Sequence, residues 1–213
     1  MRRSFSFIAF VVIASSFALA APKLETIGPC TDASVAEAVR AALSPQGYRV
    51  TFDDGSTAEL WFRSQLPAAS AKDSGGIYNL AESALVAVVR FAKPARDYRG
   101  QTVAAGAYTL RYELQPNDGD HLGTAPTRDF VLAIPAAADS NPTASYTFEP
   151  LVALSRKTTQ ARHPSPWNLV APDAKAFPSV YDDGDSHIIL ATKVNTDKGE
   201  IPLALVVQGS APQ

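Results

Sequence analysis

Alternating apolar and polar positions predict short β-strands along most of the chain. Residues 48–52 (YRVTF) and 58–62 (AELWF) alternate on either side of Asp53-Asp54-Gly55, which is typical of a hairpin turn. Residues 108–115 (YTLRYELQ) alternate most regularly. We expect their apolar members to face a core and their polar members, Thr109, Arg111, Glu113 and Gln115, to face the other way.

Three further apolar stretches extend the strand pattern. Residues 84–91 (ALVAVVRF) are almost all apolar and rich in valine, which is typical of a central strand covered on both faces. Residues 130–134 (FVLAI) predict a short buried strand. Residues 187–194 and 201–207 predict a hairpin around Asp197-Lys198-Gly199.

Helical patterns are rare. Residues 34–43 carry Val35, Val39 and Leu43 at four-residue spacing, and Ser34 with Glu37 fits a capping box. Residues 150–155 predict a one-turn helix. The predicted class is therefore all-β, an Ig-like antiparallel β-sandwich with a short N-terminal helix and a hairpin appendage. We expect one domain over residues 21–213, with 84–209 as the sandwich core and 34–64 as a possible α+β appendage.

The first twenty residues have the layout of a secretory signal peptide. Arg2 and Arg3 precede the apolar run 5–17, and Ala18-Leu19-Ala20 is a small-residue cleavage signal. We therefore expect residues 1–20 to be removed and the mature chain to be periplasmic or secreted. The Arg-Arg-x-Phe start leaves the general secretory and twin-arginine routes both open. No later apolar stretch is long enough to predict a membrane span in the mature chain.

Charge and cysteine content narrow the possible partners. Without Arg2 and Arg3, 17 Lys and Arg face 21 Asp and Glu, a net charge of −4. No basic run exceeds two residues, so nucleic acid is not an expected partner. Cys30 is the only cysteine, which excludes an internal disulfide but leaves a bridge between two chains open.

Sequence motifs for common catalytic chemistry are missing. The chain contains no GxSxG, HExxH, GxGxxG or GxxxxGK[ST] motif. A catalytic triad assembled from distant loops remains possible. The pattern favours a protein that is not an enzyme.

Histidines and aspartates gather beside turns and suggest one alternative. Imidazole and carboxylate together suit zinc, iron or manganese. No cofactor is expected in the leading interpretation. In the alternative, if the loops converge, a divalent metal could be held by His121, His163, His187, Asp120 and Asp185. The simpler interpretation is that the aspartates bond their own turns and the histidines cap them.

Other candidates for binding lie in the same loops. The candidate binding residues are Asp118, Asp120, His121, Arg128, Asp129, His163 and Trp167. Arg128-Asp129 either fixes the geometry of its loop or holds a substrate anion. Trp167, expected on a loop within HPSPWNL, either contacts a ligand or closes one end of the sandwich.

One stretch of the chain supports a resemblance. Residues 105–112 (AGAYTLRY), then Gln115-Pro116, 118–121 (DGDH), Gly123, Pro126 and 128–130 (RDF), resemble the signature of a family of uncharacterised secreted bacterial proteins, a domain of unknown function. The likeness extends from residues 59–61 to 163–164, and it implies no activity. The sequence thus predicts an exported binding or interaction module of the cell envelope, with a protein or a glycan as partner. The alternative is a metal-binding protein or a metal-dependent enzyme.

Overall fold

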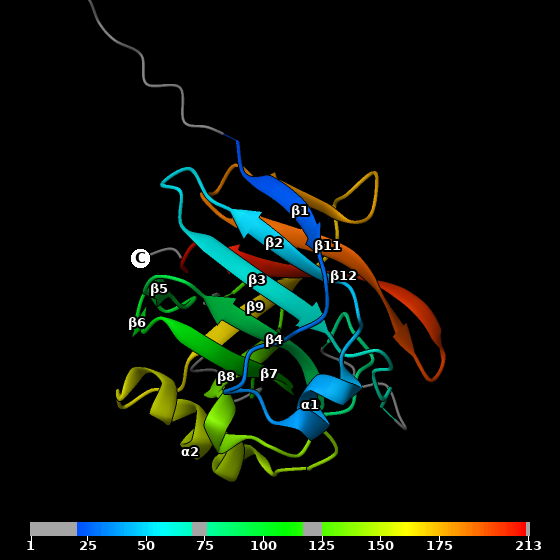
Figure 1. Cartoon of the computed structure of the whole chain (residues 1–213), viewed down its shortest axis with the longest axis vertical. Coiled ribbons are helices and arrows are strands. Elements are labelled where there is room, and N and C mark those ends of the chain that lie inside the picture. Colours follow the sequence, from blue (N-terminus) through cyan, green and yellow to red (C-terminus); the bar gives the residue numbers. More distant parts are fainter. Residues whose placement is uncertain (1–20, 70–75, 117–124, 212–213) are drawn as a thin grey trace, which may run out of the picture.

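The computed structural model describes residues 21–69, 76–116 and 125–211, which form an antiparallel sheet of ten strands (Figure 1). Its strands follow the order β1-β2-β3-β4-β7-β8-β9-β12-β11-β10, and β5 and β6 form a separate short hairpin. The strand bounds are β1 Lys23–Ile27, β2 Gly47–Thr51, β3 Thr57–Phe62, β4 Leu85–Phe91, β5 Ala95–Arg96, β6 Thr102–Val103, β7 Gly106–Leu114, β8 Asp129–Pro135, β9 Pro166–Val170, β10 Ser179–Asp182, β11 Ile188–Thr196 and β12 Gly199–Gln208. The all-β class is confirmed.

The sheet is continuous and curls nearly into a barrel. Its edge strands β1 and β10 approach each other, and β1–β3 lie in front of β11 and β12 in Figure 1. Strand β9 joins the two layers, because its first residues pair with β8 and its last residues pair with β12. A strand shared in this way joins the two layers into one sheet. In an Ig-like sandwich the two layers are separate sheets.

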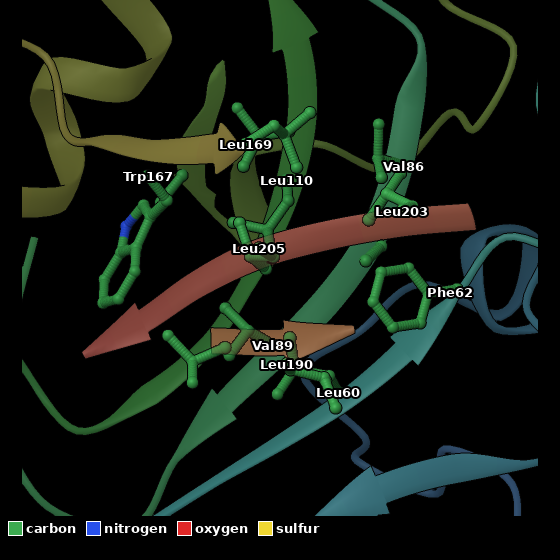
Figure 2. Packing of buried hydrophobic residues seen from close by; sticks show 14 of the residues in the cluster. Leu60, Phe62, Val86, Val89, Leu110, Trp167, Leu169, Leu190, Leu203 and Leu205 are labelled. Carbon is green, nitrogen blue, oxygen red and sulfur yellow. The ribbon is translucent and has the colours of Figure 1, made fainter. Parts of the chain in front are cut away.

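The main core fills the space between the two layers. Leu60, Phe62 and Val89 come from one layer and Leu190, Leu203 and Leu205 from the other, and all are buried (Figure 2). Removal of this apolar surface from water is the main driving force for the curled arrangement.

The predicted hairpins and the central strand form as expected. Residues 48–52 and 58–62 become β2 and β3, residues 84–91 become β4, and the C-terminal hairpin becomes β11 and β12. Strand β3 pairs with β4, and Val50 and Leu60 belong to the main core. Strands β2 and β3, which belong to the possible appendage over residues 34–64, therefore share the sheet and the main core.

The N-terminal helix is shorter than expected and lacks the predicted cap. Helix α1 spans Glu37–Ala42, and its N-cap residue is Ala36. The Ser34 hydroxyl donates to Asp32 at 2.6 Å, so the capping box was a wrong prediction. Asp32 also accepts the Ser34 backbone N–H, a local turn that competes with helix capping. The helix buries Val39 against Trp61 and its neighbours on the outer face of the sheet.

The second helix is longer than the predicted single turn. Helix α2 spans Phe148–Thr159 and covers the outer face of β8 with Leu151 and Val152. Pro150 lies in its first turn. A proline fits there because the backbone N–H groups of the first turn have no partner within the helix. Ser155 and Thr158 both donate to the Ala133 carbonyl of β8 at 2.8 Å. Within the described ranges, no helix has the length and apolar character needed to cross a membrane.

Strand β7 departs from the prediction in an important way. Tyr108, Leu110, Tyr112 and Leu114 do face the main core. Thr109, Arg111 and Glu113 face the other way as expected, but they are also buried, which the alternation did not predict. The polar side of β7 is covered by the segment that joins β8 to α2.

Arg111 holds that covering segment in place. Its Nε and Nη2 donate to the two carboxylate oxygens of Asp139 at 2.7 and 2.8 Å. Its remaining hydrogen bonds reach three backbone carbonyls, those of Ser83, Asn141 and Ala144, at 2.7 to 2.9 Å. Arginine has five N–H donors, so this buried guanidinium is fully paired. The Tyr146 ring also lies 5.0 Å from its Cζ.

Replacing one partner of the buried Arg111–Asp139 ion pair should lower the stability of the fold. We expect Arg111→Met to lower the free energy of unfolding by about 3 to 5 kcal/mol, because it leaves the Asp139 carboxylate buried without its partner. Urea denaturation monitored by circular dichroism measures this loss. The control is Lys193→Met, which breaks an ion pair with Glu200 whose side chains are both more than half exposed. That change should cost less than about 1 kcal/mol. A loss for Arg111→Met as small as that of the control would show that the pair does not hold the segment.

Candidate ligand-binding cavity

A cavity of about 920 Å³ opens where the two edges of the sheet approach each other. It is lined by the β2–β3 turn, the segment after β4, strand β10 and the end of β12, together with Ala21 and Pro22 ahead of β1. We call it the mouth cavity. Its volume falls in the range of small-molecule sites, roughly 300 to 1,000 Å³, and barrel mouths are a common position for such sites.

The floor of the mouth cavity is apolar. It is formed by Phe52, Phe91, Val180, Ile188 and Val207, all of which belong to the main core or pack against it. Phe91 stacks on Trp167, with ring centroids 5.2 Å apart and planes inclined by 21°. The indole of Trp167 therefore lies directly behind one wall of the cavity.

The rim carries charges of both signs. Asp53, Asp54 and Asp182 supply carboxylates, and Lys93 and Arg96 supply cations. Hydroxyls and an amide add uncharged donors and acceptors, from Ser56, Thr57, Ser186, Ser210 and Gln208. Hydrogen bonds from Ser56, with the nearby charge of Lys93, lower the pKa of Asp54, so this carboxylate is ionised at neutral pH. Such a rim can bind a ligand rich in hydroxyl groups.

The cavity exists because the barrel does not close. Strand β1 pairs with β2 alone, and β10 pairs with β11 alone. Among the described residues, no strand pairing joins β1 to β10. The gap between the edges leaves part of the apolar interior accessible from outside.

His187 fixes one wall of the cavity. Its Nδ1 lies 2.8 Å from an Asp183 carboxylate oxygen and its Nε2 lies 3.1 Å from the Ser210 carbonyl. Both partners accept hydrogen bonds, so the geometry favours an imidazolium with a proton on each nitrogen. Burial of the ring opposes the charge, but the Asp183 and Ser210 hydrogen bonds and the charges of Asp183 and Asp185 outweigh it and raise the pKa of His187.

Gly209 lets the chain pass close to this imidazole. A Cβ atom at Gly209 would lie 2.5 Å from Cδ2 of His187 and 2.8 Å from the Ser186 carbonyl oxygen. Its φ of +118° also disfavours other residues. The end of β12 is therefore held tightly against the β10–β11 turn.

The described residues include only three of the predicted metal ligands, His163, His187 and Asp185. Asp118, Asp120 and His121 lie outside the described residues. His163 is exposed after α2, whereas His187 is buried and both of its nitrogens have partners. Asp185 is exposed and acts on His187 through its charge. In the described part of the chain, no group of three or more His, Cys, Asp or Glu is placed to hold a metal ion.

Asp129 has a structural position rather than one at a surface. It is buried and accepts hydrogen bonds from the backbone N–H groups of Ile77 and Tyr78 at 2.8 and 2.9 Å and from the Tyr112 hydroxyl at 2.7 Å. Arg128 donates from Nε to the Gln115 carbonyl at 2.8 Å. Asp129 thus takes the first of the two roles considered for this pair, because its hydrogen bonds fix the geometry of its loop.

Trp167 does not lie on a loop, as the sequence predicted, but in strand β9. Its side chain is 4% exposed and packs in the main core. The lining of the mouth cavity was missed as well. Asp53 and Asp54 were explained by the turn alone, and Tyr181 and Asp182 belong to β10, a strand that the alternation did not reveal.

Comparison with family models, curated proteins and solved structures found no match to this chain.

The His187 contact should make stability depend on pH. Because the pKa of His187 is raised in the folded state, its contribution is fully present below the ordinary value of 6.5 and is lost as the pH rises through the folded pKa. The pKa of Asp183 is lowered, since its hydrogen bonds with His187 and Asp185 outweigh the effect of burial, so its contribution is lost only in acid. We expect His187→Gln to lower the free energy of unfolding by about 1 kcal/mol at pH 6 and by less at pH 9.

Urea denaturation of both proteins at the two pH values measures this difference. An equal loss at pH 6 and pH 9 would show that the imidazolium does not contribute to holding the wall.

Proposed function

We propose that the chain is an exported binding protein of the cell envelope that holds a short glycan in the mouth cavity. The observation that carries this proposal is the cavity itself, in which an apolar floor is surrounded by carboxylates, cations and hydroxyls. The signal peptide expected over residues 1–20 supports a place in the envelope.

The chemistry of the lining favours a sugar over a lipid. A sugar ring has apolar C–H faces that pack on aromatic rings, and its hydroxyl groups both donate and accept hydrogen bonds. Phe52, Phe91 and Tyr181 provide the rings, and the rim provides acceptors and donors within the same cavity. A lipid chain needs apolar walls along its length, and charged residues would lose solvation there without gaining partners.

The lining supports binding more than catalysis. Its described residues include neither histidine nor cysteine. The lowered pKa of Asp54 suits an acceptor for sugar hydroxyls and makes this carboxyl a poor proton donor at neutral pH.

Trp167 provides the means of testing the proposal. The chain has two tryptophans, and Trp61 lies elsewhere, with its indole N–H bonded to the Gly28 carbonyl at 2.8 Å. In a Trp61→Phe variant, fluorescence reports on Trp167, which stacks on the cavity wall residue Phe91. We expect a saturable change with at least one member of a panel of neutral, N-acetylated and uronic-acid oligosaccharides, confirmed by calorimetry on the unaltered protein.

Variants at Tyr181 test whether the ligand binds in the mouth cavity. We expect Tyr181→Ala to weaken binding about tenfold, which corresponds to about 1.4 kcal/mol, because it removes a ring from the cavity. Tyr181→Phe keeps the ring and should stay within about threefold. Phe148→Ala removes a partly exposed ring from α2 and should have no effect. Absence of saturable heat with every sugar in the panel, or equal weakening by the Tyr181 and Phe148 changes, would contradict the proposal.

A further inference from the structure

A second surface feature is a group of basic side chains beside the end of α2. We call Arg99, Arg156, Arg162 and His163 the basic cluster; all four are exposed. They come from two segments that are bonded to each other. The Tyr98 backbone N–H donates to the Pro166 carbonyl at 3.0 Å, and Gln101 Nε2 donates to the Pro164 carbonyl at 2.9 Å. The turn that carries Arg99 is thereby fixed against the segment that carries His163.

The end of α2 brings the other members of the cluster together. Gln160 has a left-handed backbone conformation, with a φ of 54°, and its N–H donates to the Arg156 carbonyl at 3.0 Å. This cap reverses the chain, so Arg162 and His163 return beside the last turn of the helix. Buried contacts hold the frame, because the Ser165 backbone N–H donates to the Ser155 hydroxyl at 2.9 Å. The cluster therefore has a rigid support.

The described residues supply no ion-pair partner for the arginines of the cluster. Within the described residues, none of Arg99, Arg156 and Arg162 forms an ion pair with a carboxylate. Two other arginines, Arg49 and Arg90, both contact Glu59. The nearby carboxylate of Asp97 is buried and already accepts the backbone N–H groups of Arg99 and Gln101. Three arginines without an ion-pair partner among the described residues thus gather on a chain of net negative charge.

Repulsion within the cluster is visible at His163. The charge of Arg99 lowers the pKa of His163, and slight burial of the ring and the charges of Arg162 and Arg156 act in the same direction. A simple alternative is that the cations stabilise the carbonyl end of α2. That explains Arg156 and Lys157, but Arg99 and Arg162 lie outside the helix. Like charges held together without partners destabilise the fold unless an anion binds between them.

We propose that the basic cluster binds the phosphate group of an anionic ligand, at residues that do not line the mouth cavity. Guanidinium groups suit this chemistry, because their planar pairs of N–H donors match two phosphate oxygens. Arg99 comes from the β5–β6 turn and Arg162 from the segment after α2, so two different parts of the chain contribute guanidinium groups to the cluster. The proposal does not depend on the mouth cavity binding a glycan.

His163 reports on phosphate binding directly. A bound dianion favours the imidazolium, so phosphate should raise the pKa of His163, and by linkage it should bind more tightly as the pH falls. The measurement is an NMR titration of the histidine ring protons, in inorganic phosphate and in sodium chloride of the same ionic strength. The His163→Gln variant identifies the resonance. We expect phosphate to raise the pKa by about 0.5 units more than chloride does, with no change at His187.

Variants test whether the arginines are responsible. Arg99→Gln and Arg162→Gln remove exposed side chains and should each abolish most of the phosphate effect. Lys193→Gln removes an exposed cation on β11 and should leave the effect unchanged. Equal effects of phosphate and chloride on His163, or a phosphate effect that persists in both arginine variants, would overturn the proposal.

A second experiment distinguishes two sources of the phosphate group, a lipid headgroup and a soluble phosphate ester. Sedimentation with vesicles of phosphatidylglycerol, compared with phosphatidylcholine, tests a lipid headgroup. Binding to the anionic vesicles that is lost in Arg162→Gln would assign the cluster to a membrane surface. A phosphate effect on His163 without vesicle binding would assign it to a soluble phosphate ester. Vesicle binding that survives in Arg162→Gln, without a phosphate effect on His163, would contradict the proposal.

Discussion

The buried ion pair between Arg111 and Asp139 is the contact on which the arrangement of this fold depends. A guanidinium inside a protein is tolerated only when its donors are paired, and here a carboxylate and three backbone carbonyls accept all of its hydrogen bonds. The pair fixes the segment after β8 across the outer side of β7. That segment leads into α2, which covers β8. Strands β7 and β8 can therefore be buried on both faces.

Burial on both faces determines where ligands can approach. The interior of the barrel is filled, and helices or loops cover much of its outer surface. The gap between β1 and β10 interrupts this cover, and the mouth cavity lies there. His187 and Gly209 keep the end of β12 tightly packed along this gap, so the wall of the cavity has a defined shape before any ligand binds. A preformed wall lowers the entropic cost of binding.

Sequence reasoning predicted most strands but not the contacts that organise them. Alternation places Tyr112 in the core correctly, yet it does not predict that Arg111 is buried, because its partner Asp139 lies 28 residues away and no local pattern connects them. Strand β9 was missed because prolines interrupt its pattern, although Pro166 occupies the first position, where a strand tolerates proline. The cavity was missed for a related reason. Its residues come from the ends of distant strands, and each one, such as Asp53, has a sufficient local explanation as part of a turn.

The central claim is that the open edge of the barrel, at the mouth cavity, is a binding site. Mapping of backbone amide chemical shifts during titration with the oligosaccharide panel tests this most directly. The account predicts that changes concentrate at Thr57, Tyr181 and Gln208, which line the cavity from three strands, and leave the amides of α2 unchanged. Changes centred on another surface, or no changes with any sugar in the panel, would contradict it.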